Sequence, residues 1–83
     1  MPRYYFHLRD GADLLLDPEG RLLDGTEAIA AATLAEARAI LCADIRQGKL
    51  GLDQLIDVED ARGRVVHRLS FIDAVKIHWP VTN

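Results

Sequence analysis

The chain has little cysteine, few aromatic residues and little net charge, and each shortage excludes a class of protein. Its single cysteine, Cys42, excludes an intramolecular disulfide and a zinc site built on cysteine pairs. Ten basic residues against thirteen acidic ones leave a formal net charge of −3, so we expect no nucleic-acid partner. One Trp, two Tyr and two Phe predict a largely aliphatic core.

Long apolar runs are also missing from the chain. No stretch approaches the roughly 18 apolar residues that a membrane-spanning helix needs. The opening MPRYYFHLRDG lacks the apolar core of a signal peptide. We therefore expect a cytoplasmic protein without a membrane partner.

The length and composition are those of one small globular domain. The chain has 83 residues, of which 49% are hydrophobic and 28% charged. A domain of this size buries roughly 60–65% of its unfolded surface, so we expect modest stability. We place a single α+β domain at residues 1–75 and a C-terminal tail at residues 76–83.

Short strands and turns fill the first part of the chain. Residues 3–9 alternate and are rich in aromatics, which predicts a strand. The turn at residues 10–13 leads to a second strand at residues 14–16, and the two form a hairpin. After the turn at residues 17–20, residues 21–23 predict a short third strand. The two faces of the first strand carry Tyr4, Phe6 and Leu8, and Tyr5, His7 and Arg9.

A long helix follows. From Thr26 to Gln47 there is no Gly or Pro and alanine is abundant. Asp24 and Glu27 have the spacing of a capping box, with Thr26 as a competing N-cap, and Gly48 is placed to end the helix. The expected core face carries Ala30, Leu34, Ala37, Leu41 and Ile45, flanked by Ile29, Thr33 and Ile40.

A second hairpin follows the helix. Residues 54–60 and 64–69 predict its two strands, joined by a turn at residues 60–63. Ser70 is placed to cap one helical turn at residues 71–75. On the second strand we expect Val65, His67 and Leu69 on one face, and Val66 and Arg68 on the other. Cross-strand charge pairs are expected between Arg62, Arg64 and Arg68 and the acids Asp57, Glu59 and Asp60.

The predicted element order is β-β-(β)-α-β-β. Because hairpins pair antiparallel, we expect an α+β fold in which an antiparallel sheet of about four strands packs on one long helix. One helix covers only one face of such a sheet. The opposite face must then be polar or covered by a partner.

His7 is the first candidate for chemistry. A strand that presents Tyr5, His7 and Arg9 on one face can bind an anion or hold a proton acceptor. However, catalysis needs convergent partners, and a single strand histidine is more commonly bonded to a backbone or carboxylate neighbour. No catalytic residue and no cofactor is therefore assigned.

The candidate binding surface combines Tyr5, His7 and Arg9 with Trp79 of the tail. An exposed apolar tail with a Trp can anchor an interface. The alternative, which is equally weighted, is that the tail docks on its own domain.

The other acidic, histidine and cysteine side chains have structural explanations that need no ligand or reaction. The acids around the first two turns do not have the EF-hand pattern, and each suits a turn or a cap. His7, His67 and His78 are far apart in sequence, so no metal is expected. Cys42 lies inside the helix without a neighbouring base, where free cysteine is commonly a small buried hydrophobe.

Several motifs together resemble one known family. They are the opening MPRYYFHLRDG, the turn DPEGRLL, the Asp24 before an alanine-rich helix, and the hairpin DVEDARGRVVHRLSF. The family is a group of short bacterial proteins catalogued as a domain of unknown function, which typically open Met-Pro-Arg-Tyr-Phe-Phe-His. The resemblance covers roughly residues 1–75, with Tyr5 in place of the usual Phe. It implies no activity and no site residues, because the family has none established.

A looser likeness is to HicB-type antitoxins. Asp10-Gly11 in the first turn and Glu27-Ala28 at the start of the alanine-rich helix match the N-terminal part of those proteins. The likeness is at the level of fold only.

Three functions are compatible with these residues. The favoured one is a non-catalytic protein-interaction module that self-associates as a homodimer through an uncovered sheet face, an edge or the tail. The second is an antitoxin-like or regulatory protein that binds a protein partner. The third is a small enzyme or metal-dependent protein centred on His7.

Overall fold

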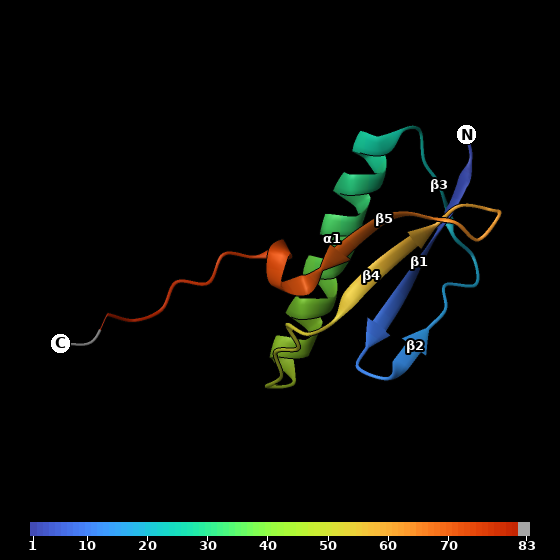
Figure 1. Ribbon diagram of the computed structural model, residues 1–83. Helices are drawn as coiled ribbons and strands as arrows, with labels where there is room; N and C mark the ends of the chain where they lie inside the picture. The colour runs from blue at the N-terminus through green and yellow to red at the C-terminus, as the bar shows by residue number, and fades with distance from the viewer. Residues whose placement is uncertain (82–83) are drawn as a thin grey trace.

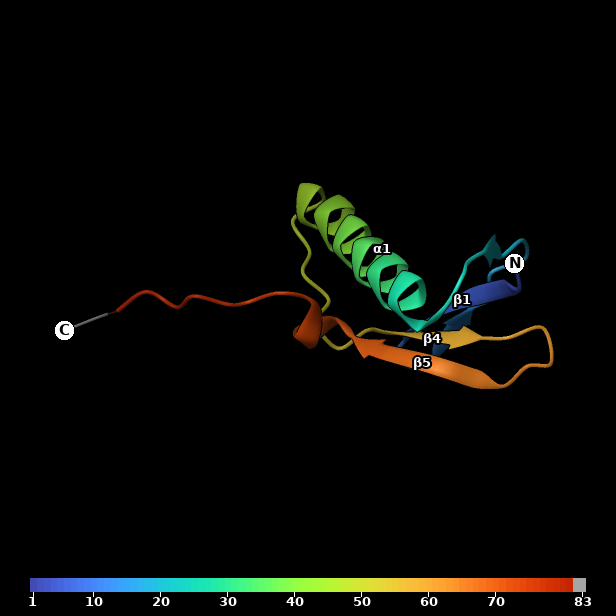
Figure 2. The ribbon, with the colours of Figure 1, turned by 90° about the horizontal axis from the view of Figure 1, so that it is seen from above.

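A computed structural model describes residues 1–81 and has two layers, an antiparallel sheet and one long helix (Figures 1 and 2). It confirms the predicted α+β fold and element order. The strands are β1 (Arg3–Asp10), β2 (Asp13–Leu15), β3 (Arg21–Leu22), β4 (Leu55–Glu59) and β5 (Val65–Ser70). The helix is α1 (Thr26–Arg46), and a 3-10 turn η1 (Phe71–Ala74) follows β5.

The strands run in the order β2-β1-β4-β5, and the short β3 also pairs with β1. Leu8 lies opposite Leu15 of β2, and Tyr4 lies opposite Arg21 of β3. Residues 16–20, which connect β2 to β3, do not pair with β1. Strands β2 and β3 are therefore two parts of one interrupted edge strand, and β1 and β4 form the centre of the sheet.

The helix begins without the predicted capping box. Gly25 is the N-cap, with φ 93°, and no side chain donates or accepts a capping hydrogen bond. Because Gly25 takes the cap position, the Asp24 carboxylate lies one residue too early to reach the free N–H groups of the first turn. The predicted end is confirmed: Gly48 has φ 76°, and the Lys49 N–H donates to the Asp44 carbonyl at 3.0 Å.

The buried face of α1 is rotated from the predicted one. The buried residues are Ile29, Thr33, Ala37 and Leu41. Ala30 and Ile45, expected in the core, are exposed, and so is Cys42. The Thr33 hydroxyl makes the difference, because it donates to the Ile29 carbonyl at 2.6 Å and so enters the core without an unpaired polar group.

The core lies between α1 and the helix-facing side of the sheet. The helix packs mainly over β4, β5 and η1. The Phe71 N–H donates to the Gln54 carbonyl at 2.9 Å, which ties the η1 turn to the start of β4. The buried apolar residues are Phe6, Ile29, Ala37, Leu41, Ile56, Val58, Phe71 and Ala74.

Strand β5 departs from strict alternation. A β-bulge lies opposite Val58 and Glu59, where Val66 is the extra residue. As a result Val66 and His67 line the same hollow of about 270 Å³ beside the start of α1, and Val65 is 49% exposed. The predicted placement of Val66 and His67 on opposite faces is wrong for this reason, whereas Val65, opposite Glu59, stays on the other face from Val66. Ser70 precedes η1 at the predicted position but makes no side-chain capping hydrogen bond.

Beyond η1 the chain leads away from both layers (Figures 1 and 2). Trp79 is 78% exposed and Val81 is 91% exposed. The final two residues of the predicted tail, 82–83, lie outside the described residues. Within residues 1–81, no helix is both long enough and apolar enough to cross a membrane.

Candidate functional site

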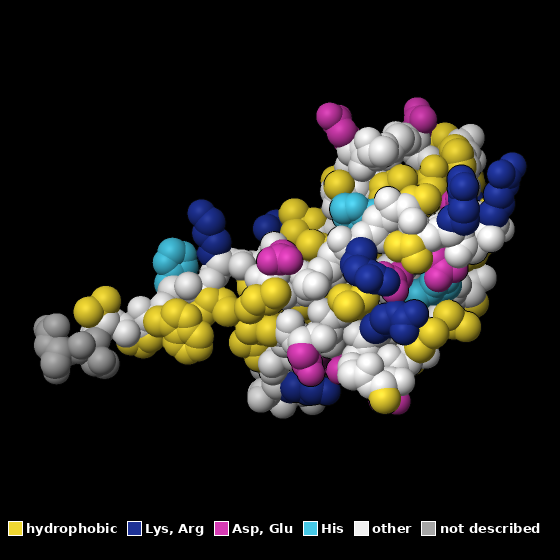
Figure 3. Space-filling view, viewed as in Figure 1, with side chains coloured by type: hydrophobic (Ala, Val, Ile, Leu, Met, Phe, Trp, Pro, Cys, Tyr) yellow, Lys and Arg dark blue, Asp and Glu magenta, His cyan; other side chains and the backbone are white. Residues whose placement is uncertain are grey.

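The face of the sheet away from α1 carries a compact group of polar side chains. Figure 3 looks onto this open face, where basic, acidic and histidine side chains lie next to one another among apolar ones. The alternation of β1 that buries Phe6 against the helix turns its neighbours to this side. The group consists of Tyr5, His7 and Arg9 from β1, Asp57 and Glu59 from β4, and Arg68 from β5.

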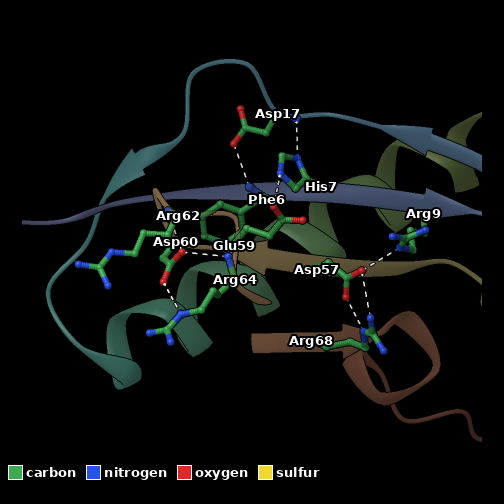
Figure 4. Close-up of polar contacts among 10 residues, drawn as sticks. All are labelled: Phe6, His7, Arg9, Asp17, Asp57, Glu59, Asp60, Arg62, Arg64 and Arg68. Carbon is green, nitrogen blue, oxygen red and sulfur yellow. Dashed lines mark hydrogen bonds and ion pairs between the residues drawn. The ribbon is translucent and has the colours of Figure 1, made fainter. Parts of the chain in front are cut away.

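Asp57 is the centre of this group. It is only 1% exposed and lies opposite His7 on one side and Arg68 on the other. Arg9 Nε donates to Asp57 Oδ2 at 2.8 Å (Figure 4). Arg68 donates through Nε to Oδ1 and through Nη2 to Oδ2, the latter at 3.2 Å. The predicted cross-strand pair of Arg68 is therefore present, and two guanidinium groups hold one carboxylate.

This contact sets the charge of the carboxylate. The hydrogen bond from Arg68 lowers the pKa of Asp57, burial opposes that effect, and Arg9 lowers the pKa further, so that it lies below its ordinary value. The side chains of Arg9 and Arg68 are 49% and 58% exposed. Arg9, Arg68 and Asp57 thus present two half-exposed cations around one carboxylate, while Glu59 on the same face balances the remaining positive charge. The exposed guanidinium groups can still contact an acidic group.

His7 is held by both the backbone and a stacked neighbour. Its Nδ1 accepts the Asp17 N–H at 3.0 Å, and its Nε2 lies 3.6 Å from Glu59 Oε1 (Figure 4). Its ring stacks on Tyr5 with centroids 6.4 Å apart. Because Nδ1 accepts a hydrogen bond, the neutral imidazole carries its proton on Nε2. The hydrogen bond from the Asp17 N–H to His7 therefore holds the loop at residues 17–20 against β1.

The carboxylate of Asp17 completes that attachment. It accepts the Phe6 N–H at 3.0 Å, and the Glu19 and Gly20 N–H groups at 3.1 Å each. Burial raises the pKa of Asp17, but the three N–H donors together hold it below the ordinary value. The turn predicted at residues 17–20 is thereby fastened to the middle of β1.

Gly20 is required in this fastened loop. Its φ is 69°, and an added Cβ would lie 2.7 Å from the Tyr4 carbonyl oxygen. The sequence predicts a turn at residues 17–20 but does not indicate that this turn is hydrogen-bonded to β1. The partners His7 and Asp17 are ten residues apart, so no local pattern joins them.

The last hairpin contains the expected pair between Arg64 and Asp60, next to the turn. Asp60 Oδ1 accepts the N–H groups of Arg62 at 2.9 Å and Arg64 at 3.0 Å, and these donors lower the pKa of Asp60. The Arg64 guanidinium contacts Asp60 at 3.6 Å within the turn (Figure 4). Arg64 therefore pairs inside the turn, and Gly63 closes it with φ 83°.

The structure brings together three of the four residues of the predicted binding surface. Tyr5, His7 and Arg9 share the open face, whereas Trp79 stands apart on the tail. His67 lines the hollow on the helix side and His78 lies on the tail, so neither joins His7. Within residues 1–81, no three His, Cys, Asp or Glu side chains are grouped to hold a metal ion.

Sequence reasoning missed a second surface, a hollow of about 400 Å³ between α1 and the β1–β2 side of the sheet. We call it the leucine groove. Leu15 and Leu16 on its rim are 60% and 66% exposed. Arg21 of β3 and Glu36 of α1 pair across it at 2.5 Å. Its apolar lining is Phe6, Leu8, Leu15, Leu16, Ile40 and Ile56. The sequence does indicate exposed leucines here, because three successive leucines at 14–16 cannot all face one side of a strand.

These features define a small α+β domain in which one helix covers the β4–β5 side of an antiparallel sheet and leaves an apolar groove and a polar open face. Within that class, the chain belongs to the family described as Domain of unknown function (DUF6894), whose model matches residues 3–72. The match confirms the resemblance found in the sequence, and the looser likeness to HicB-type antitoxins gains no support from it. No curated protein and no solved structure shows significant similarity to the chain.

Proposed function

We propose that this protein is a small non-catalytic interaction module of the cytoplasm that self-associates as a homodimer. One observation carries the proposal: the leucine groove is left open beside the single helix. Leu15 and Leu16 are more than half exposed there, beside the partly buried Leu8 and Ile40. Burying an exposed leucine contributes about 1.5–3 kcal/mol, so covering both in each copy favours association by several kcal/mol.

The mass in solution tests this proposal. Light scattering or sedimentation of the full chain at micromolar concentration is expected to give twice the mass of one chain. A strict monomer throughout that range would reject self-association.

A matched pair of variants locates the contact. Leu16→Asp places a charge in the groove and is expected to shift the chain to monomer. Leu50→Asp changes a leucine that is 54% exposed outside the groove and is expected to leave the dimer intact. Equal behaviour of the two variants would mean that the groove is not the contact surface.

A second candidate is a regulatory protein that binds an acidic segment of a protein partner through the open face. The half-exposed guanidinium groups of Arg9 and Arg68 beside Tyr5 favour it. A photo-reactive residue in place of Tyr5 is expected to cross-link such a partner in the native cell, and the same residue in place of Ile72 to capture none. Cross-linking that is independent of the position would reject this role for the open face. In neither candidate is a nucleic acid or a membrane the partner.

A further inference from the structure

We propose that the tail at residues 76–81 of one copy occupies the leucine groove of a second copy. This inference rests on the proposed self-association and names the contact that produces it. Two copies related by a two-fold axis would exchange tails, so that each groove receives the tail of the other chain.

The tail has the pattern of a segment that binds along one face. Ile77, Trp79 and Val81 alternate with polar residues or proline, so in an extended chain their side chains point to one side. Trp79 is 78% exposed, although tryptophan is one of the residue types enriched among interface anchors. The tail therefore carries an apolar face that its own domain leaves in water.

The exit of the tail favours a second copy over the chain's own groove. Arg38 Nε donates to the Ala74 carbonyl at 2.9 Å, and Val75 packs against the core. These contacts fix the direction in which the chain leaves η1. In both views the tail runs away from β2, which borders the groove (Figures 1 and 2).

The charges of the two surfaces are complementary. Around the leucine groove the carboxylates outnumber the cations, and the groups are Asp17, Glu19, Glu36 and Arg21. The tail carries Lys76 and His78 and no acidic side chain between residues 76 and 81. An acidic rim around an apolar floor thus matches an apolar segment with basic neighbours.

The expected contact area suits a stable dimer. A buried tryptophan contributes about 150–250 Å², so two exchanged tails with their Ile and Val side chains bury roughly 1,500 Å² in total. That area falls in the range of specific interfaces. One tail alone on one groove would bury about half of it.

Trp79 reports the contact directly, because it is the one tryptophan of the chain. We expect its fluorescence emission to shift to shorter wavelength as the concentration rises, in step with the increase in mass. Trp79→Ala is expected to raise the dissociation constant of the dimer by about 30-fold or more, as loss of an interface anchor does. Leu50→Ala, at an exposed leucine outside both the tail and the groove, is the control and is expected to change it less than about twofold.

Mixing variants separates exchange from docking on the same chain. A Trp79→Ala copy retains its groove, and a Leu16→Asp copy retains its tail. Their mixture is expected to form mixed dimers with one intact contact, more tightly than either variant associates alone. Because Trp79 lies outside the sheet and the helix, the tail variant tests the contact even if the groove variant folds poorly.

The outcomes distinguish this inference from the proposal on which it rests. A dimer whose Trp79 stays in water, or which Trp79→Ala leaves intact, overturns the tail exchange and retains self-association. A monomer with Trp79 buried at every concentration means that the tail docks on its own domain, which overturns both. A monomer with Trp79 in water also overturns both.

Discussion

The two halves of the sheet have similar apolar content but different cover. On the β4–β5 side, Ile56, Val58 and Phe71 are at most 1% exposed beneath α1. On the β2–β3 side, Leu15 and Leu16 are 60% and 66% exposed. The difference lies in the helix, whose buried stripe contains the small residues Thr33 and Ala37 and is too narrow to span five strands. Apolar sequence alone therefore does not make a core; a second element must lie over it.

The largest expected effect tests this comparison by truncating one side chain from each half. Phe71→Ala empties a fully buried site and is expected to cost about 3–5 kcal/mol of unfolding free energy. Leu22→Ala, at a half-exposed position on the open face of the β2–β3 side, is expected to change it by less than about 0.5 kcal/mol. Urea unfolding followed by circular dichroism measures both. Similar losses would show that the two halves are equally covered in solution.

The next effect concerns the open face. Asp57→Ala leaves Arg9 and Arg68 facing each other without their carboxylate and is expected to cost about 2–3 kcal/mol. The cost stays below that of a fully buried ion pair, because both arginines are half exposed. Asp53→Ala, at an exposed position, is the matched control. A loss as small as that of the control would mean that water replaces the carboxylate without penalty.

A smaller effect is expected from His7. His7→Ala leaves the Asp17 N–H without its acceptor and is expected to cost about 1–2 kcal/mol. Hydrogen exchange at the Asp17 amide is expected to accelerate in the same variant. His7→Asn offers a carbonyl oxygen near the position of Nδ1 and should recover part of both losses. If Asn is as damaging as Ala, the ring packs rather than binds the loop.

The smallest effect is the dependence on pH. The folded-state pKa values of Asp17 and Asp57 lie below their unfolded values, so the stability that these groups contribute is fully present above about pH 4. It is lost as the pH falls through the lower folded values. We expect the melting temperature to drop steeply below about pH 4 and the drop to be shallower in Asp57→Asn. Parallel curves for the two proteins would contradict this assignment.

Local patterns predicted most of the fold. The alternation of β1, the bounds of α1 and the turn at Asp60 each depend on residues close in sequence, and the structure confirms them. The N-cap of the helix was misjudged because Gly25, with its positive φ, takes the place of a side-chain cap. The core face was misjudged because a back-bonded threonine is as buried as an alanine.

The candidate site was predictable only in part. Strand alternation placed Tyr5, His7 and Arg9 on one face, and charge pairing joined Arg68 to Asp57. The leucine groove depends on where a helix lies over a sheet, which is decided by packing between distant elements. No local pattern in the sequence contains that information.

The loop that Asp17 fastens to β1 also limits how copies of this chain can assemble. It divides the β2–β3 edge, which lies opposite the β5 edge of the sheet, into paired stretches of three and two residues. A flat, continuous edge offers a row of free backbone groups on which further chains add strand by strand into fibres, whereas a short, divided edge does not. Because a growing fibre must pair at both edges of each sheet, discouraging pairing at this edge stops growth even though β5 has a free edge, and association through side chains can close after two copies.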